Sequence, residues 1–242
     1  MKNSTLYFLS TFILLGSQLS WGQIITQQTG IRHTVRIDDT IPITNAETGK
    51  PATLKEFKEL TSVDPYGYHL IPDYNESGQP KAYTIRKATV EEREIRGFRD
   101  RDPNKQPKVG KPIAPFVMTG MDKKVYRSVD LVGNVIVLSF LVNLNRPFWG
   151  DKDAAKLTDA LRPYQSENGP IVLGVMADEA EVPNGSTLPF MPILNGHGFH
   201  GKYHITSIPT IIVIDKKGNV AASLEGGSAF DELKQVLSTV SR

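Results

Sequence analysis

Histidines form the most concentrated set of chemically capable side chains in this sequence. His197, His200 and His204 lie within eight residues, just upstream of Pro209, with glycines between them. Imidazole nitrogens are the commonest ligands for transition metals, so this cluster raises the hypothesis of a metal-handling protein. The spacing matches no established metal geometry, and histidines at a surface or at the end of a helix fit it better.

Adjacent carboxylates occur at Glu91/Glu92 and at Asp178/Glu179. The first pair lies in a charged stretch and the second follows an apolar run that predicts a strand, so we interpret both as solvated charge. The sequence contains no phosphate-binding loop, no serine-hydrolase elbow and no zinc-protease motif. Carboxylate chemistry therefore suggests no enzyme class.

Cysteine is absent from all 242 residues. Thiol-disulfide exchange and the first step of thiol-based peroxide reduction both need a thiolate, so neither reaction can run on this chain. Its stability must also come from packing alone, without disulfides.

The overall charge points to no polyanionic partner. Lysine and arginine total 28 against 26 acidic residues, which leaves a formal charge of +2. That balance gives no basic field for nucleic acid or for an anionic membrane surface. With 39% hydrophobic residues, the chain has enough apolar content for a substantial core.

The N-terminus has the pattern of a secretory signal peptide. Lys2 precedes a short apolar run, and small residues follow as far as Gly22. The run is too short and too interrupted for a membrane span, which needs about 20 apolar residues. We predict a signal peptide over residues 1–22, a mature chain that begins at Gln23, and a periplasmic or extracellular protein with no stable membrane anchor.

Residues 23–108 are predicted to form a small α+β accessory region followed by a charged linker. Thr53 with Glu56 and Thr89 with Glu92 have the capping-box spacing and predict two short helices. A hairpin is predicted between them, with arms at 69–74 and 82–86. The stretch 91–111 is dense in charge and contains prolines, which is typical of a linker.

The second half has the pattern of an α/β domain. Apolar β-branched runs at 135–142, 171–176 and 210–215 predict buried strands, and a helical period over 151–164 separates the first two. A turn at 216–219, a returning strand at 220–224 and a last helix capped by Ser228 complete the pattern. A βαβ unit followed by ββα is the thioredoxin order, a central mixed sheet flanked by helices.

Residues 109–242 resemble the exported thioredoxin-like proteins of the TlpA/ResA type, a group related to the redoxins. The segment 109–116, VGKPIAPF, is similar to the family's opening G-x-x-A-P-x-F, and 131–138, LVGNVIVL, is similar to its L-x-G-K-x-V-x-L. Near the C-terminus, 205–210 and 214–218 resemble the family's V-x-x-x-P-T segment and its I-D-x-x-G turn. The order and spacing of these weak motifs make the resemblance specific.

The resemblance places the family's C-x-x-C loop on Asn145, Arg146, Pro147 and Phe148. Asn145 occupies the position of the nucleophilic thiol and Phe148 that of the resolving thiol. Pro147 matches the proline of the common C-P-P-C form, and the resemblance implies that Pro209 is the cis-proline facing this loop. An amide at position 145 is neither nucleophilic nor titratable, so the resemblance implies the fold without its redox activity.

The leading hypothesis is a redox-inactive thioredoxin-like module that binds an exported or envelope protein or peptide. In proteins of this fold the backbone beside the cis-proline pairs with an extended peptide, which needs no thiol. An apolar rim is expected from a set of four residues, with Pro209 beside it: Leu144, Phe148, Trp149 and Ile208. The alternatives are that Phe148 and Trp149 merely plug the inactive loop, that the histidines bind copper, or that an oxidoreductase acts through an unrecognised site. We expect no cofactor.

Overall fold

The structure, a computed structural model, describes residues 40–144, 148–165, 169–178, 187–194 and 196–240. The predicted signal peptide and the mature N-terminus at Gln23 lie outside the described residues. No helix within the described ranges combines the length and the apolar character needed to cross a membrane.

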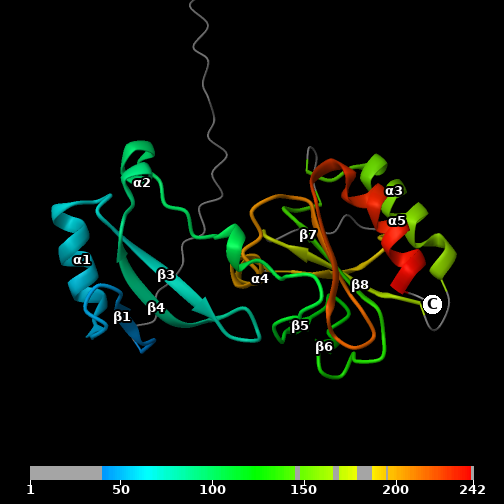
Figure 1. Cartoon of the computed structure of the whole chain (residues 1–242), viewed down its shortest axis with the longest axis horizontal. Coiled ribbons are helices and arrows are strands. Elements are labelled where there is room, and N and C mark those ends of the chain that lie inside the picture. The colour runs from blue at the N-terminus through cyan, green and yellow to red at the C-terminus, as the bar shows by residue number, and fades with distance from the viewer. Residues whose placement is uncertain (1–39, 145–147, 166–168, 179–186, 195, 241–242) are drawn as a thin grey trace, which may run out of the picture. The chain divides into compact units, whose positions relative to one another are not determined.

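Residues 43–95 form a four-stranded sheet with two short helices (Figure 1). The sheet order is β2-β1-β4-β3, in which β3 and β4 are the predicted antiparallel hairpin and β1 pairs parallel to β4. The elements are β1 (Ile43–Asn45), β2 (Pro51–Ala52), α1 (Leu54–Val63), β3 (Tyr68–Tyr74), β4 (Pro80–Lys87) and α2 (Val90–Ile95).

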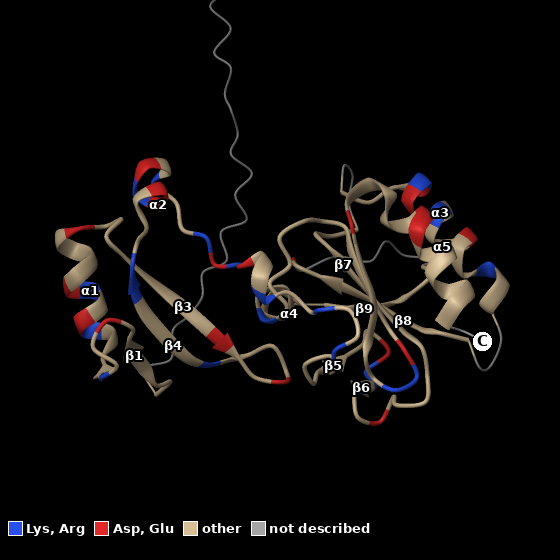
Figure 2. Cartoon of the chain, in the orientation of Figure 1, with Lys and Arg blue, Asp and Glu red and all other residues tan. Residues whose placement is uncertain are grey.

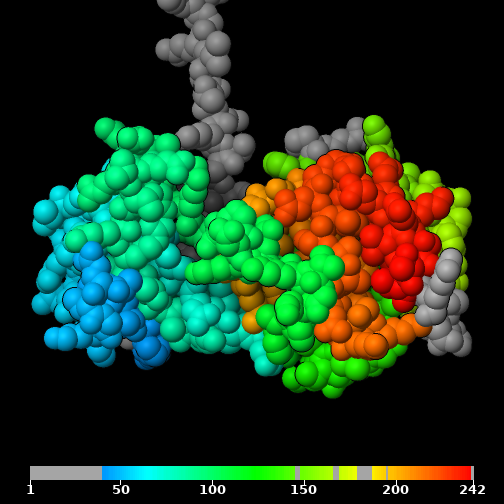
Figure 3. Space-filling view, in the orientation of Figure 1, coloured from blue at the N-terminus to red at the C-terminus, as the bar shows by residue number. Residues whose placement is uncertain are grey.

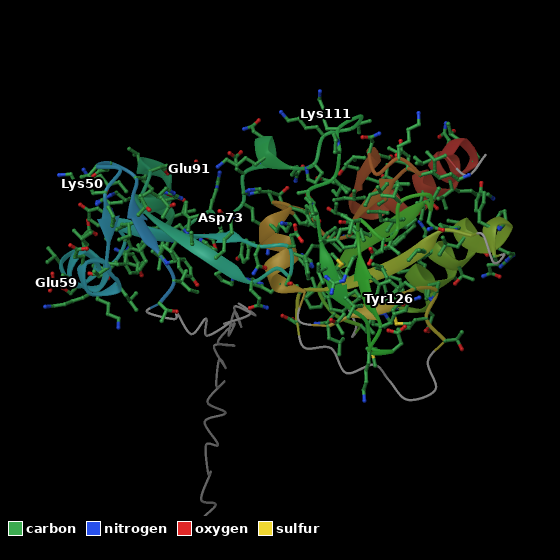
Figure 4. All side chains as sticks on the ribbon, turned by 90° about the horizontal axis from the view of Figure 1, so that it is seen from below. Lys50, Glu59, Asp73, Glu91, Lys111 and Tyr126 are labelled. Carbon is green, nitrogen blue, oxygen red and sulfur yellow. The ribbon has the colours of Figure 1, made fainter. Side chains whose placement is uncertain are left out.

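Both predicted capping boxes are present at the starts of α1 and α2. The carboxylate of Glu92 is buried, and it also accepts hydrogen bonds from Arg86 at 2.5 and 2.6 Å and from the Arg99 N–H at 2.8 Å. Other charged side chains of this region, such as Lys50, Glu59 and Glu91, project outward (Figure 4). Local caps therefore fix where the helices start, and one buried ion pair fastens α2 to β4.

A small apolar core fastens α1 to one face of this sheet. Four buried side chains of the sheet, Ile43, Leu70, Tyr83 and Ile85, pack against partly buried residues that include Phe57 and Leu60 of α1. The core is small, and burial of these apolar side chains is what holds the region together.

The stretch predicted as a linker is hydrogen-bonded to the second half of the chain. Arg101 donates to the carbonyl oxygen of Ile205 at 2.6 Å, and the Gln106 side chain donates to the carbonyl oxygen of His204 at 3.1 Å. A short 3-10 turn, Pro103–Lys105, lies between these contacts. The high charge density suggested a solvated connection, but the Arg101 and Gln106 side chains bind backbone carbonyls of the second half instead.

The second half has a five-stranded sheet in the order β11-β10-β7-β8-β9. Strands β7, β8 and β9 run parallel, while β10 and β11 are antiparallel to their neighbours. The strands are β7 (Ile136–Leu141), β8 (Ile171–Met176), β9 (Met191–Ile193), β10 (Thr210–Ile214) and β11 (Val220–Glu225), and a separate hairpin is formed by β5 (Val117–Thr119) and β6 (Val125–Arg127). The helices are α3 (Asp151–Leu161), α4 (His197–Lys202) and α5 (Ala229–Val240).

Alternating side chains of the central strand β7 pack into two cores, one on each face of the sheet. Val137 and Leu141 face the core under α3 and α5, which lie side by side (Figure 1). Ile136, Leu138 and Phe140 face the core that includes the β5–β6 hairpin and α4. Because both faces are covered, β7 and β8 carry no charged residue (Figure 2), as a buried parallel strand requires.

This arrangement is the thioredoxin-like α/β fold that the sequence predicted. The predicted span of β8 matches the structure, and those of β7 and β10 differ only at their ends. Ser228 belongs to a 3-10 turn, Gly226–Ser228, that leads directly into α5. One side of α5 lies at the surface of the molecule (Figure 3).

Candidate functional site

The two loops of the predicted groove lie at the same edge of the central sheet. Antiparallel pairing places Thr210, the first residue of β10, opposite Phe140 near the end of β7. The loop that follows β7 and the segment that precedes β10 therefore emerge next to each other. The Ile208–Pro209 peptide bond between Ser207 and β10 is cis. Asn145, Arg146 and Pro147 lie outside the described residues.

The structure divides the predicted apolar rim into buried and exposed residues. Leu144 is 7% exposed and Trp149 is 6% exposed, and both belong to the core under α3 and α5. Phe148 is 50% exposed and Ile208 is 36% exposed. The rim is therefore narrower than the sequence suggested, because only Phe148 and Ile208 present apolar side chains at the surface.

Trp149 is buried in the core under α3 and α5. Its ring stands edge-on to Phe190, with centroids 5.4 Å apart, and to Phe230 at 6.0 Å. Edge-to-face pairs of this kind add specific stabilisation to apolar burial. Phe148 is half exposed, so the two adjacent aromatic residues have different environments.

The backbone beside Pro209 is open on one side. Pro209 accepts a hydrogen bond from the Gly226 N–H at 2.8 Å, and Ser207 accepts one from the Thr210 hydroxyl at 2.7 Å. Neither the N–H nor the C=O of Ile208 takes part in a hydrogen bond among the described residues. Exposed backbone groups of this kind can pair with an added strand.

A polar pair that the sequence analysis did not join lies at the carboxyl ends of β7 and β8. The Asn143 side-chain nitrogen lies 3.5 Å from a carboxylate oxygen of Asp178. Parallel pairing of Leu141 with Met176 brings these two residues to the same level. The sequence pattern of one strand does not show which residues of the adjacent strand lie beside it. Only the register between β7 and β8 shows that Asn143 and Asp178 are neighbours.

The three histidines do not converge on one point. His197 and His200 are in α4, and His204 follows it with a left-handed backbone at φ 51°. The His200 ring lies fully buried, with Nε2 3.0 Å from the carbonyl oxygen of Val175 and its ring edge-on to Phe140. The His204 Nδ1 accepts the Asp102 N–H at 3.1 Å.

The surroundings of His200 and His204 favour neutral imidazoles. Burial lowers the pKa of His200 to about 3, and burial also lowers the pKa of His204. Within the described ranges no group of three histidine, aspartate or glutamate side chains is placed to hold a metal ion. His200 is held in the core by the Val175 carbonyl oxygen, whereas His204 lies beyond the end of α4 and is bonded to Asp102.

Comparison with known proteins finds sequence similarity to one kind of protein. Thiol-disulfide oxidoreductase ResA of Bacillus thuringiensis and that of Bacillus anthracis are each 27% identical over 138 residues, which cover 54% of this chain and 78% of the relative. No family model matches the chain.

Solved structures with some likeness include a thiol-disulfide oxidoreductase from Bacteroides fragilis, 18% identical with a TM-score of 0.43, over 52% of this chain and 100% of that one. StoA from Bacillus subtilis is 19% identical with a TM-score of 0.38, over 51% and 96%.

Proposed function

From the homology of about half of the chain to the thiol-disulfide oxidoreductase ResA, in a chain without cysteine, we propose a redox-inactive thioredoxin-like protein that binds an extended peptide segment of another exported protein. The peptide adds as a strand beside Ile208. The observation that carries this proposal is the pair of unused backbone groups at Ile208, next to the cis Pro209.

Exposed apolar side chains on the two adjoining loops support the same surface. Ile208 and Phe148 remain at the surface, while the neighbouring Leu144 and Trp149 are buried. An exposed aromatic beside an open backbone edge is typical of a small anchor for a partner side chain. Because Phe148 and Ile208 form only a small apolar anchor, hydrogen bonds to the Ile208 backbone must supply much of the orientation of the bound peptide.

Export is part of the proposal, on the strength of the leader-like pattern at residues 1–22. The partner is then a protein or peptide of the periplasm or the outer surface. N-terminal sequencing of the protein from the cell envelope tests this step, with Gln23 as the expected first residue.

A photo-crosslinking amino acid at position 148 tests the groove in living cells. The matched control carries the same crosslinker in place of Val132, another exposed apolar residue of the same domain. We expect a defined adduct with a second protein from position 148 and none from position 132. Equal adducts from both positions would contradict the proposed surface.

Two substitutions at Ile208 then separate backbone pairing from side-chain contact. Ile208→Ala and Ile208→Pro both remove the apolar side chain, but only proline also removes the N–H. In the 148-crosslinker background we expect Ile208→Ala to weaken the adduct and Ile208→Pro to abolish it. Equal yields from the two variants, with both shown to be folded by circular dichroism, would exclude strand addition.

A further inference from the structure

The edge strand of the four-stranded sheet, β3, borders a groove in the accessory region. β3 pairs with β4 on one side and with no other strand of the described residues. A cavity of about 530 Å³ is lined by Tyr68, Leu70, Pro72 and Tyr74, which are alternate residues of this strand, and also by His69. This volume is within the range of binding clefts, roughly 300–1,000 Å³.

The register of the hairpin shows which backbone groups of β3 point away from β4. In an antiparallel pair, residues that exchange hydrogen bonds with the partner strand alternate with residues whose N–H and C=O point outward. The Ala88 N–H donates to the Gly67 carbonyl oxygen at 2.9 Å, and the same register continues along the hairpin. The odd-numbered residues of β3 therefore bond with β4, while Tyr68, Leu70 and Pro72 direct their backbone groups toward the free edge.

These outward backbone groups are unused. Within the part of the chain that the structure describes, no hydrogen bond involves the N–H or C=O of Tyr68 or Leu70, or the C=O of Pro72. Backbone groups without a partner are rare in a protein interior, so these groups must meet water or another molecule. Pro72 has no N–H, which limits the open edge to a short segment and discourages unlimited growth of the sheet.

Aromatic walls border this edge on both faces of the sheet. On the face of Leu70, which packs toward α1, Phe57 of that helix lines the groove. On the opposite face Phe98 lines it, and its ring stacks on His69 with centroids 4.3 Å apart and an interplanar angle of 5°. A second copy of the chain would bring its own α1 and its own Phe98 to the same space. A single extended peptide therefore fits the groove better.

One negative charge restricts the side chains that the groove accepts. Asp100 is the only aspartate, glutamate, lysine or arginine among the described residues that line it, and its side chain is 55% exposed. Its carboxylate is hydrogen-bonded to His69 Nε2, its one such partner within the described ranges. A lysine or arginine of a peptide can pair with this carboxylate, whereas an acidic side chain would be repelled.

We propose that β3 accepts an extended peptide of another protein as an added strand, through the outward backbone groups of Tyr68, Leu70 and Pro72. Opposite residues of neighbouring strands share one face, so the peptide residue beside Leu70 is apolar and packs toward Phe57. The next peptide residue points to the other face, where a lysine or arginine meets Asp100. None of these residues belongs to the groove of the proposed function.

A phage-displayed library of random heptapeptides tests this site on the mature chain. The library is first depleted on Thr61→Trp, which fills the groove, and is then selected on the native chain. Depletion also removes peptides that bind at Ile208, because that surface is intact in the variant. Thr61 lines the groove, whereas the neighbouring Ser62 is exposed and does not, so Ser62→Trp is the matched control. We expect selected peptides to carry an apolar residue next to lysine or arginine and to bind Ser62→Trp as they bind the native chain.

N-methylation of a selected peptide, one residue at a time, tests the backbone pairing. Only alternate residues of an added strand bond with β3, so methyl groups at alternate positions should weaken binding about tenfold and those between should have little effect. Asp100→Asn should weaken binding about 2- to 5-fold, as the loss of an exposed ion pair does. Asp73→Asn is the control, because Asp73 is an exposed carboxylate of β3 that does not line the groove.

Thermal unfolding shows whether each variant is folded. If Thr61→Trp unfolds, Gln79→Trp takes its place, since Gln79 is exposed and lines the groove at the hairpin.

Three results would overturn the proposal. The first is that no peptide is enriched on the native chain after depletion on the folded, blocked variant. The second is an N-methylation series without alternation. The third is a dimer of the native chain in analytical ultracentrifugation that the blocked variant loses and Ser62→Trp keeps, because the occupant of the edge would then be a second copy.

Discussion

His200 shows how a chemically capable residue becomes structural through burial. Its Nε2 bonds the Val175 carbonyl oxygen, its Nδ1 has no partner among the described residues, and its pKa is lowered to about 3. In the unfolded chain the same group has a pKa of about 6.5. Folding therefore favours the neutral ring, and this contribution is present above about pH 6.5 and lost as the pH falls toward 3.

The free energy of unfolding should fall by about 2 kcal/mol between pH 7 and pH 5 because of His200 alone, since one proton corresponds to about 1.4 kcal/mol per pH unit. Urea unfolding of His200→Leu at both values should show a pH dependence smaller by that amount. His204→Leu serves as the control, because His204 is only partly buried and should contribute less. An identical pH dependence in His200→Leu and the native protein would show that His200 does not carry the effect.

The element that leads into α3 carries two adjacent aromatic residues with opposite environments. Trp149 packs against Phe190 and Phe230, whereas Phe148 is half exposed. Trp149→Ala should lower the free energy of unfolding by about 3–5 kcal/mol, because it leaves a large cavity in the core. Phe148→Ala should change it by less than about 1 kcal/mol, as an exposed position does.

Denaturant unfolding of these two variants distinguishes the plug from the groove. If Phe148→Ala is as destabilising as Trp149→Ala, then Phe148 fills the loop and cannot anchor a partner. Weaker recovery of the partner by pull-down with Phe148→Ala, at unchanged stability, fits the peptide-binding role.

At the scale of the whole molecule, the fold persists without the thiols that define the chemistry of its relatives. The native chain should show no insulin reduction above a buffer blank, because it contains no sulfur nucleophile. Replacing Asn145 and Phe148 together by cysteine should produce an intramolecular disulfide, if these positions match the family's pair.

Mass spectrometry detects this disulfide as the loss of two hydrogens, and each single cysteine variant is the control. A double variant that stays reduced under air oxidation would show that the loop positions are misaligned. Turnover that scales with the amount of native protein would contradict redox inactivity.

Local sequence signals determined much of the fold. The apolar β-branched run before Leu141 has no charge to leave exposed, so it predicts a buried strand, and β7 is one. Thr53 and Thr89 each precede a glutamate by three residues, so their caps form from neighbouring atoms alone. The absence of cysteine likewise settled, without any structure, that thiol chemistry is excluded.

Tertiary structure alone decided which side chains are available at each site. Phe148 and Trp149 are adjacent aromatic residues, and the periodicity of the sequence does not show which ring is exposed and which is buried. The packing of α3 beside α5 decides this. The sequence suggested His200 as a possible metal ligand, but the packing of α4 against β8 buries its ring. Tyr83 has the pattern of an ordinary strand residue, and only the packing around it leaves its hydroxyl without a partner among the described residues. Burial and pairing depend on contacts between distant segments, and local periodicity does not encode them.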